Sequence, residues 1–273
     1  MDSAVEYYEA KAALEWQIEL GADEAIGDVP LDRYELVAES PKVKAAQADP
    51  AGKSVPKPSA APIPIVEVDA VAVAKVAAAN AADLVGLEAA LAGFNLCELK
   101  RGARNLVFAD GALPARVMII SEAPNREDDR AGKPFSGQAG VLLDRMLAAI
   151  DLGRDGSDSA PPSAGSVYTT TALPWRTPQD RDPTPDEIAM LRPFIERHVE
   201  LAAPDVVVLM GNAPCSAMLG RKGITRLRGT WESVMGRPAL PMFHPAYLLR
   251  NPRAKREAWA DLLELKAKLD SIA

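Results

Sequence analysis

The 273-residue chain contains few cysteines and no long apolar run, and each shortage excludes a class of protein. Its two cysteines, Cys97 and Cys215, cannot form the disulfide framework of a small secreted domain and fit a reducing cytoplasm. No stretch of about 18 apolar residues is free of charge, and the acidic N-terminus lacks the segments of an export signal. We therefore expect a cytoplasmic globular protein that does not interact with a membrane.

Common ligand-binding motifs are also missing. The chain contains neither GxGxxG nor GxxxxGK[ST], so the usual dinucleotide and P-loop sites are not supported. No Cys, His, Asp or Glu spacing typical of a metal site is present, and we predict no metal.

The net charge of −7 is unevenly distributed. Residues 1–80 carry 14 acidic and 7 basic residues, whereas the remainder carries 24 of each. A neutral domain can still present a basic face, and local charge controls phosphate binding more than the total does. Solvated surface charge explains either basic cluster equally well. The two clusters are Arg221, Lys222, Arg226 and Arg228, then Arg250, Arg253, Lys255 and Arg256.

The composition divides the chain into three parts. Residues 1–40 form an extension in which 4–20 show the apolar spacing of an amphipathic helix. Residues 41–70 are rich in Ala and Pro and predict a flexible linker, because they bury too little apolar surface to offset the entropy of ordering. Residues 71–273 are the expected globular domain, which begins with an Ala-rich helix over 71–92.

Within this domain, apolar runs alternate with helical patterns. Four runs predict strands that are buried on both faces, as parallel strands are. Strands that alternate with helices predict a three-layer α/β/α sandwich around a four-stranded parallel sheet. The predicted strands are 117–120, 167–171, 205–211 and 240–243, and the predicted helices are 141–150, 184–202, a short one ending at 219, and 253–272.

His244 is the strongest candidate for chemistry. It follows a predicted strand, and imidazole exchanges its proton near neutral pH. Segments 121–125 and 211–212, together with Thr171, also follow strand ends. Open α/β sheets bring such ends together, so we expect these residues to meet in one crevice. The other histidine, His198, lies inside a charged helical segment and is expected to be structural.

Five segments become specific when their order and spacing are considered together. They are SEAPN at 121–125 with Glu127 and Asp128 following, GKPFSGQAG at 132–140, DPTPDE at 182–187, LRGTW at 227–231 and HPAYLLR at 244–250. With them, the chain from about residue 94 resembles family 4 of the uracil-DNA glycosylase superfamily. The resemblance implies the same α/β/α fold in the catalytic domain. It also implies a monofunctional hydrolase that releases uracil from a nucleotide swung out of DNA.

The resemblance assigns roles to residues that would surround the base. His244 takes the position of the hydrogen-bond donor that stabilises the departing uracil anion. Phe135 matches the aromatic that stacks on the base, and Ala123 the small residue beside it. Thr171 replaces the asparagine that reads uracil, and its hydroxyl has a shorter reach and one donor, so slower release or broader base tolerance is expected.

Activation of the attacking water is the least defined role. Ala123 stands where other branches of the superfamily carry a carboxylate, and it cannot act as a base. Glu122, Asp128 or backbone groups are the remaining candidates.

Six residues are expected to contact DNA, and a structural alternative remains open for several of them. A helix that starts at 211–212 has free backbone amides that could hold a phosphate, although a plain strand-to-helix turn explains them equally well. The resemblance implies that Tyr247 and Leu248 fill the gap left by the extruded base, while Leu248 or Leu249 is expected to pack in the core instead. The six residues are Gly211, Asn212, Arg228, Tyr247, Leu248 and Arg250.

The iron–sulfur cluster of family 4 is not expected in this chain. Four cysteines hold the cluster in that family, and the aligned positions here are Phe94, Cys97, Trp175 and Leu191. One thiolate cannot hold such a cluster, and Cys215 lies in a different segment. We predict an apolar plug in its place and no cofactor.

The leading interpretation is a monomeric glycosylase that acts on uracil-containing DNA. A noncatalytic or altered-specificity DNA-binding relative of the same fold is the alternative, which Thr171 favours. A nucleotide-binding α/β protein is a third possibility, against which the arginine-rich loops argue.

Overall fold

The computed structural model describes residue 11 and residues 69–154 and 165–272. The chain divides into two units, residues 1–63 and residues 64–273. The helix predicted over 4–20 and nearly all of the linker predicted over 41–70 lie outside the described residues. No helix in the described ranges is long and apolar enough to cross a membrane.

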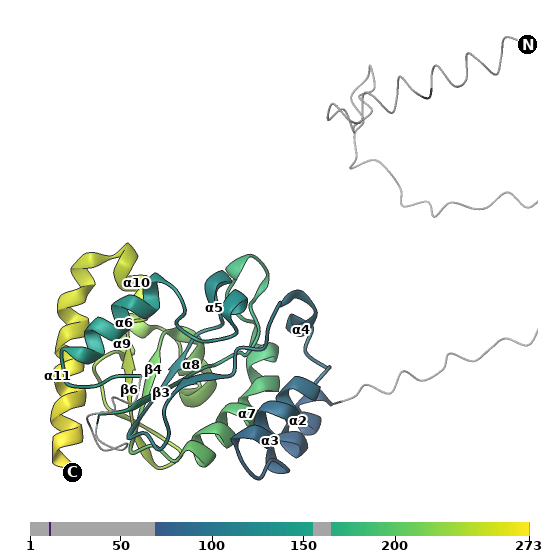
Figure 1. Cartoon of the computed structure of the whole chain (residues 1–273), viewed down its shortest axis with the longest axis horizontal. Coiled ribbons are helices and arrows are strands. Elements are labelled where there is room, and N and C mark those ends of the chain that lie inside the picture. The colour runs from purple at the N-terminus through teal and green to yellow at the C-terminus, as the bar shows by residue number, and fades with distance from the viewer. Residues whose placement is uncertain (1–10, 12–68, 155–164, 273) are drawn as a thin grey trace, which may run out of the picture. The chain divides into compact units, whose positions relative to one another are not determined.

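A six-stranded sheet forms the centre of the second unit (Figure 1). Its strand order is β1-β3-β2-β4-β6-β5, in which the four central strands are parallel and the two edge strands antiparallel. The predicted α/β class with four parallel strands is confirmed, and the edge strands are additions too short for a sequence period to reveal. The strands are β1 (Ala109–Gly111), β2 (Val117–Ser121), β3 (Val167–Thr171), β4 (Val206–Met210), β5 (Glu232–Val234) and β6 (Arg237–Met242).

Helices cover both faces of the sheet because successive strand residues point to opposite sides. Met118 and Ile120 of β2 pack in one core with helices α2, α3, α7 and α8, whereas Val117 and Ile119 pack in another with α6 and α11. The helices are α2 (Ala70–Ala79), α3 (Leu84–Gly93), α4 (Leu99–Gly102), α5 (Arg126–Ala131), α6 (Gln138–Ala148), α7 (Pro185–Ala202), α8 (Asn212–Leu219), α9 (Ile224–Leu227), α10 (Pro245–Arg250) and α11 (Lys255–Ser271), with 3-10 turns η1 (Pro178–Asp180) and η2 (Pro252–Ala254).

The Ala-rich helix predicted over 71–92 is in fact two helices. α2 ends at Asn80, and α3 begins after Asp83, whose carboxylate accepts a hydrogen bond from the Gly86 amide at 2.7 Å. Asp and Asn favour helix ends because their side chains compete for backbone N–H groups. The high helix propensity of alanine is therefore not sufficient to continue one helix across residues 80–83.

The strand order creates a crevice at the carboxyl edge of the sheet. β3 pairs with one side of β2, and the chain then crosses to form β4 on the other side. Doubly wound sheets bind ligands where the strand order reverses in this way. The segments that follow β2 and β4 adjoin at this point, and β6 lies next to β4.

Candidate active site

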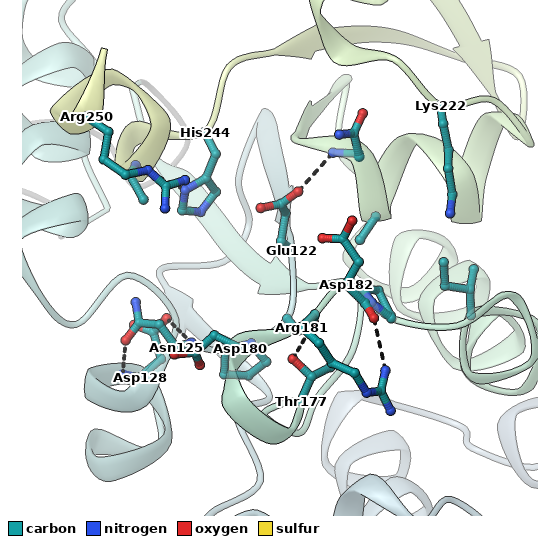
Figure 2. A pocket seen from close by; sticks show the side chains of 17 residues that line it. Glu122, Asn125, Asp128, Thr177, Asp180, Arg181, Asp182, Lys222, His244 and Arg250 are labelled. Carbon is teal, nitrogen blue, oxygen red and sulfur yellow. Dashed lines mark hydrogen bonds between the residues drawn. The ribbon is translucent and has the colours of Figure 1, made fainter. Parts of the chain in front are cut away.

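A cavity of about 380 Å³ opens at this edge of the sheet (Figure 2). Its walls come from the segments that follow β2, β3, β4 and β6, so the predicted convergence is present in the structure. Six of the residues expected at the site line it: Glu122, Ala123, Asp128, Asn212, His244 and Arg250.

His244 presents an uncharged hydrogen-bond donor to this cavity. It is the N-cap of α10, and its Nδ1 accepts a hydrogen bond from the Ala246 amide at 3.1 Å. A ring nitrogen that accepts carries no proton, so we assign the proton of the neutral ring to Nε2. Burial, with a smaller contribution from the charge of Arg250, lowers the pKa of His244 to about 4. The imidazole is therefore neutral at neutral pH.

Phe135 lies against His244 with its ring centroid 5.3 Å away and an angle of 15° between the ring planes. The Phe135 side chain is only 4% exposed and is not among the residues that line the cavity. The prediction that a base stacks on Phe135 therefore requires the side chains around this ring to rearrange.

The backbone at Phe135 is held in an unusual conformation. Its φ of +56° lies in the left-handed region, which costs a non-glycine residue about 1–2 kcal/mol. Gly140 allows the close packing there, because a Cβ at this position would lie 1.8 Å from the Phe135 carbonyl oxygen. The loop that carries Phe135 is thus tightly constrained by its surroundings.

Asp128 holds this loop in place. Its Oδ1 accepts from the Ser136 amide at 2.7 Å, and its Oδ2 accepts from the Asn125 amide at 3.2 Å. Burial raises the pKa of Asp128, and these two hydrogen bonds oppose the rise. Both carboxylate oxygens are engaged within the protein, which argues against the predicted role in water activation. Asp128 instead positions the segment around Phe135.

The carboxylate of Glu122, which follows β2, lies at the N-terminus of α8. Its Oε1 accepts from the Asn212 amide at 3.0 Å, and a Cβ on Gly211 would come within 2.5 Å of its carboxyl group. Burial is the largest cause of its raised pKa, to which the charge of Asp182 adds. The prediction that 211–212 hold a DNA phosphate is therefore wrong, because the Asn212 amide already donates to this carboxylate and the Gly211 amide donates to the Met242 carbonyl at 3.2 Å. The Asn212 side chain is structural as well, since its Oδ1 accepts from two amides of residues 223–224.

Thr171 does not face the cavity, and the prediction that it reads the base is wrong for this structure. Its side chain is buried, and its hydroxyl donates to the Val107 carbonyl at 3.2 Å. The segment around Val107 runs beside the end of β3, where the Val107 amide donates to the Pro174 carbonyl at 2.9 Å. This neighbouring backbone supplies the acceptor that turns the hydroxyl away.

Arg228 is a structural residue in this fold, contrary to the expectation that it contacts DNA. Its guanidinium pairs with the buried carboxylate of Asp261 and donates to the Glu257 carbonyl at 2.8 Å. Arg250, by contrast, is exposed at the rim of the cavity and has no hydrogen bond or ion pair within the described ranges. Of these two arginines, Arg250 is therefore the one whose side chain is available for a phosphate.

The apolar residues after His244 also divide into core and surface. Leu248 is 1% exposed and packs with Phe243 and Ala258, so the prediction that it fills the gap in DNA is wrong. Leu249 is 43% exposed. Tyr247 is partly buried and stacks on Phe243 with ring centroids 4.8 Å apart.

Several residues that line the cavity were not expected there. The segment after β3 contributes residues 180–183, although DPTPDE was used only as one of the motifs of the family resemblance. Its position after a strand end was the available signal. Asn125 is the last residue of the SEAPN motif, and Lys222 belongs to the first of the two basic clusters.

The four positions aligned with the cluster-binding cysteines do not fit an iron–sulfur cluster. Phe94, Cys97, Trp175 and Leu191 are all buried in one apolar core, where Phe94 makes an edge contact with Phe194 at 5.4 Å. Burial raises the pKa of Cys97, which favours the thiol over the thiolate that metals require. Across the described part of the chain, no three His, Cys, Asp or Glu side chains gather in a way that could hold a metal.

Comparison with known proteins points to one family. The family model described as "Uracil DNA glycosylase superfamily" matches residues 108–263. A protein of Thermotoga maritima named "Type-4 uracil-DNA glycosylase" is 35% identical over 158 residues, which cover 57% of this chain and 77% of that protein. Proteins with the same name from Saccharolobus solfataricus and Archaeoglobus fulgidus are each 32% identical, covering 64% and 62% of this chain and 81% and 84% of their own lengths.

Proposed function

The chain belongs to the uracil-DNA glycosylase superfamily, and from this membership and its site we propose that it excises uracil from DNA as the first step of base excision repair. The observation that carries the proposal is the neutral imidazole of His244, whose protonated Nε2 is left for a ligand at the carboxyl edge of the sheet. The matched region covers 77–84% of the length of each of the three relatives named for this activity, so the similarity extends over most of a glycosylase.

The reaction is a hydrolysis at the anomeric carbon. The bond between C1′ of deoxyribose and N1 of uracil breaks, and its electron pair leaves with the base. Water then adds its oxygen to C1′ and releases a proton, and the products are uracil and an abasic site. Negative charge grows on the O2 carbonyl of the departing base, where the Nε2–H of His244 can donate. With a pKa of about 4 the ring is neutral at neutral pH, and its remaining N–H can make this hydrogen bond without any further protonation.

Glu122 is the candidate for guiding the water. One of its oxygens accepts from the Asn212 amide, a backbone hydrogen bond from Ala213 also favours its charged form, and the carboxylate lines the cavity (Figure 2). A carboxylate at this place can orient a water molecule and stabilise the positive charge that develops on the sugar.

Contacts with DNA fall to the rim of the cavity. Arg250 and Lys222 are exposed there and are suited to phosphate groups. The exposed Leu249 takes the wedge role first expected of Leu248, since an apolar side chain in the gap offsets part of the unstacking cost.

We further propose that the protein needs no cofactor and acts as a cytoplasmic monomer. The apolar packing around Phe94 and Trp175 supports the absence of a cluster, and the buried thiols of Cys97 and Cys215 fit a reducing compartment. Iron analysis of freshly purified protein and light scattering test the first and last points: bound iron, or a stable dimer, would contradict them.

The central test is an excision assay. Purified protein is incubated with single- and double-stranded oligonucleotides that carry one uracil, abasic sites are cleaved, and the product is compared with that of His244→Ala. Loss of a donor to a developing anion should lower the rate by about 10²–10³-fold. Equal rates for both proteins would remove His244 from the mechanism. Binding without product from the wild type would instead favour a noncatalytic relative.

A further inference from the structure

The cavity lacks the residue that was expected to read the base, because the Thr171 hydroxyl is committed to the Val107 carbonyl. An extruded uracil nevertheless offers a second carbonyl oxygen, O4, in addition to the O2 atom beside the bond that breaks. A site that distinguishes uracil from cytosine needs a donor at this second position, because cytosine carries an amino group there. The walls of the cavity therefore have to supply another donor.

Asn125 has a carboxamide whose orientation is fixed by its neighbours. Its Oδ1 accepts hydrogen bonds from the amides of Glu127 at 2.6 Å and Asp128 at 3.1 Å. Two N–H donors can be satisfied only by the oxygen, so the chemistry determines which end of the amide is Nδ2. That Nδ2 has no partner among the described residues, and Asn125 lines the cavity beside Asp128 (Figure 2). The result is a donor with a fixed direction.

Hydrogen bonds link the segment that carries this donor to the segment of Phe135, whose ring stacks on His244. The backbone N–H of Asn125 donates to one carboxylate oxygen of Asp128, and the other oxygen accepts from the Ser136 amide. Ser136 directly follows Phe135, which stacks on His244. Asn212 is a useful contrast on the wall formed by α8. Its oxygen is held in a similar way, but its side chain is exposed and anchors the loop at 223–224.

We propose that the side-chain Nδ2 of Asn125 donates to O4 of the extruded base while His244 donates to O2, which makes Asn125 a specificity-determining residue. The inference rests on the proposed function, and it identifies uracil and other bases with a carbonyl at this position as the substrate class. Cytosine would bring its amino donor against the amide donor, and one group would remain unpaired. Discrimination against cytosine then comes from a residue that the sequence motif presents as a helix cap.

The test separates the amide donor from the capping oxygen. Asn125→Ser keeps an oxygen for the N-terminus of α5 and removes Nδ2, since serine and asparagine cap helices about equally well. Asn125→Asp also keeps the cap but replaces the donor with an acceptor. The values of kcat/KM are measured on oligonucleotides with uracil, 4-thiouracil and cytosine, alongside the melting temperature of each protein.

Asn125→Ser should lose roughly tenfold in kcat/KM for uracil, corresponding to one hydrogen bond. Its preference for uracil over 4-thiouracil should shrink, because sulfur is a poor acceptor that only the wild-type amide can sense. Asn125→Asp should lose more activity on uracil and the largest part of the preference for uracil over cytosine. A purely structural role would leave both base preferences unchanged.

The outcomes separate this inference from the proposed function. Wild-type excision together with an Asn125→Ser variant of unchanged rate and unchanged 4-thiouracil ratio would overturn the role of Asn125 alone. Should Asn125→Ser be unstable, the base preferences of Asn125→Asp decide, because a ratio measured on one preparation does not depend on its folded fraction. A wild type that releases no uracil would overturn the proposed function itself.

Discussion

The chain has two histidines, and their surroundings differ in one decisive respect. His198, on α7, stacks on Phe108 with ring centroids 4.5 Å apart, and both of its ring nitrogens have partners inside the protein, Tyr168 and Thr170. His244 also stacks on a phenylalanine, but among the described residues only its Nδ1 has a partner. Burial lowers both pKa values, to about 3 for His198 and about 4 for His244.

The comparison shows that neither burial nor a shifted pKa distinguishes the histidine that we propose to be functional from the structural one. The distinguishing feature is a ring nitrogen that remains uncommitted and faces a cavity. The same distinction applies to the arginines, since Arg228 is consumed by internal partners whereas Arg250 stands at the rim. Four changes would break or sharpen this contrast.

The largest effect on stability is expected at Arg228. Arg228→Ala leaves the buried carboxylate of Asp261 without its partner, and the free energy of unfolding should fall by about 3–5 kcal/mol. Arg250→Ala is the matched control and should change stability by no more than about 0.5 kcal/mol. It should instead reduce the salt dependence of DNA binding by about one phosphate contact. Urea denaturation and binding titrations at several salt concentrations measure both, and a stable Arg228→Ala variant with weakened DNA binding would reverse our assignment.

His198→Ala should act on stability and not on chemistry. The change opens a cavity and leaves the Tyr168 hydroxyl without its partner, for a cost of about 2–4 kcal/mol in the free energy of unfolding. Single-turnover excision by the folded protein should remain within about twofold of the wild type, which corresponds to less than 0.5 kcal/mol. A hundredfold loss of rate at unchanged stability would mean that His198 contributes to the site.

Thr171→Asn tests whether the end of β3 reads the base. The residue is buried and its hydroxyl serves the Val107 carbonyl, so a larger side chain should cost about 1–3 kcal/mol of stability without raising the excision rate. The rate is measured at a temperature where both proteins are folded. A clear gain in uracil excision would show that this side chain can reach the base.

The fourth change is a change of pH, on which stability depends through the two histidines. Below pH 6.5 the unfolded chain takes up protons at both histidines, whereas the folded protein resists them until about pH 4 and about pH 3, so their contribution lowers the free energy of unfolding as the pH falls through this window. The raised pKa values of Glu122, Asp128 and Asp261 act in the opposite direction, because the folded protein then binds protons more readily than the unfolded chain.

The histidine contribution is isolated by comparing two proteins. Urea midpoints of the wild type and of His198→Ala are measured on either side of pH 6.5. The wild type should lose more stability on acidification than the variant does, and equal slopes would contradict the low pKa of His198. Excision by the wild type should show no inflection near pH 6.5, because His244 stays neutral there.

Much of the fold and the position of the site could be predicted from local patterns. The apolar runs of the four central strands and the helical pattern over 184–202 depend on neighbours within a few residues, and each is present in the structure. The convergence of strand ends follows from parallel pairing, so the crevice with His244 and Glu122 was also within reach of the sequence. The division of the Ala-rich segment into α2 and α3 was not predicted, because the high helix propensity of the alanines obscures the two capping residues, Asn80 and Asp83.

The sequence by itself determined which residue types stand at the edge of the sheet, whereas the tertiary structure decided which of them remain available. Thr171, Arg228, Leu248 and the amides at 211–212 were all expected to meet the substrate, and each is engaged by a partner or by core packing instead. Several of those partners lie far along the chain: Val107 is 64 positions from Thr171, and Glu122 is 90 positions from Asn212. A buried polar group must be paired, and only the packed fold brings distant groups close enough to do so. Which donors stay free for a ligand is therefore a property of the folded molecule.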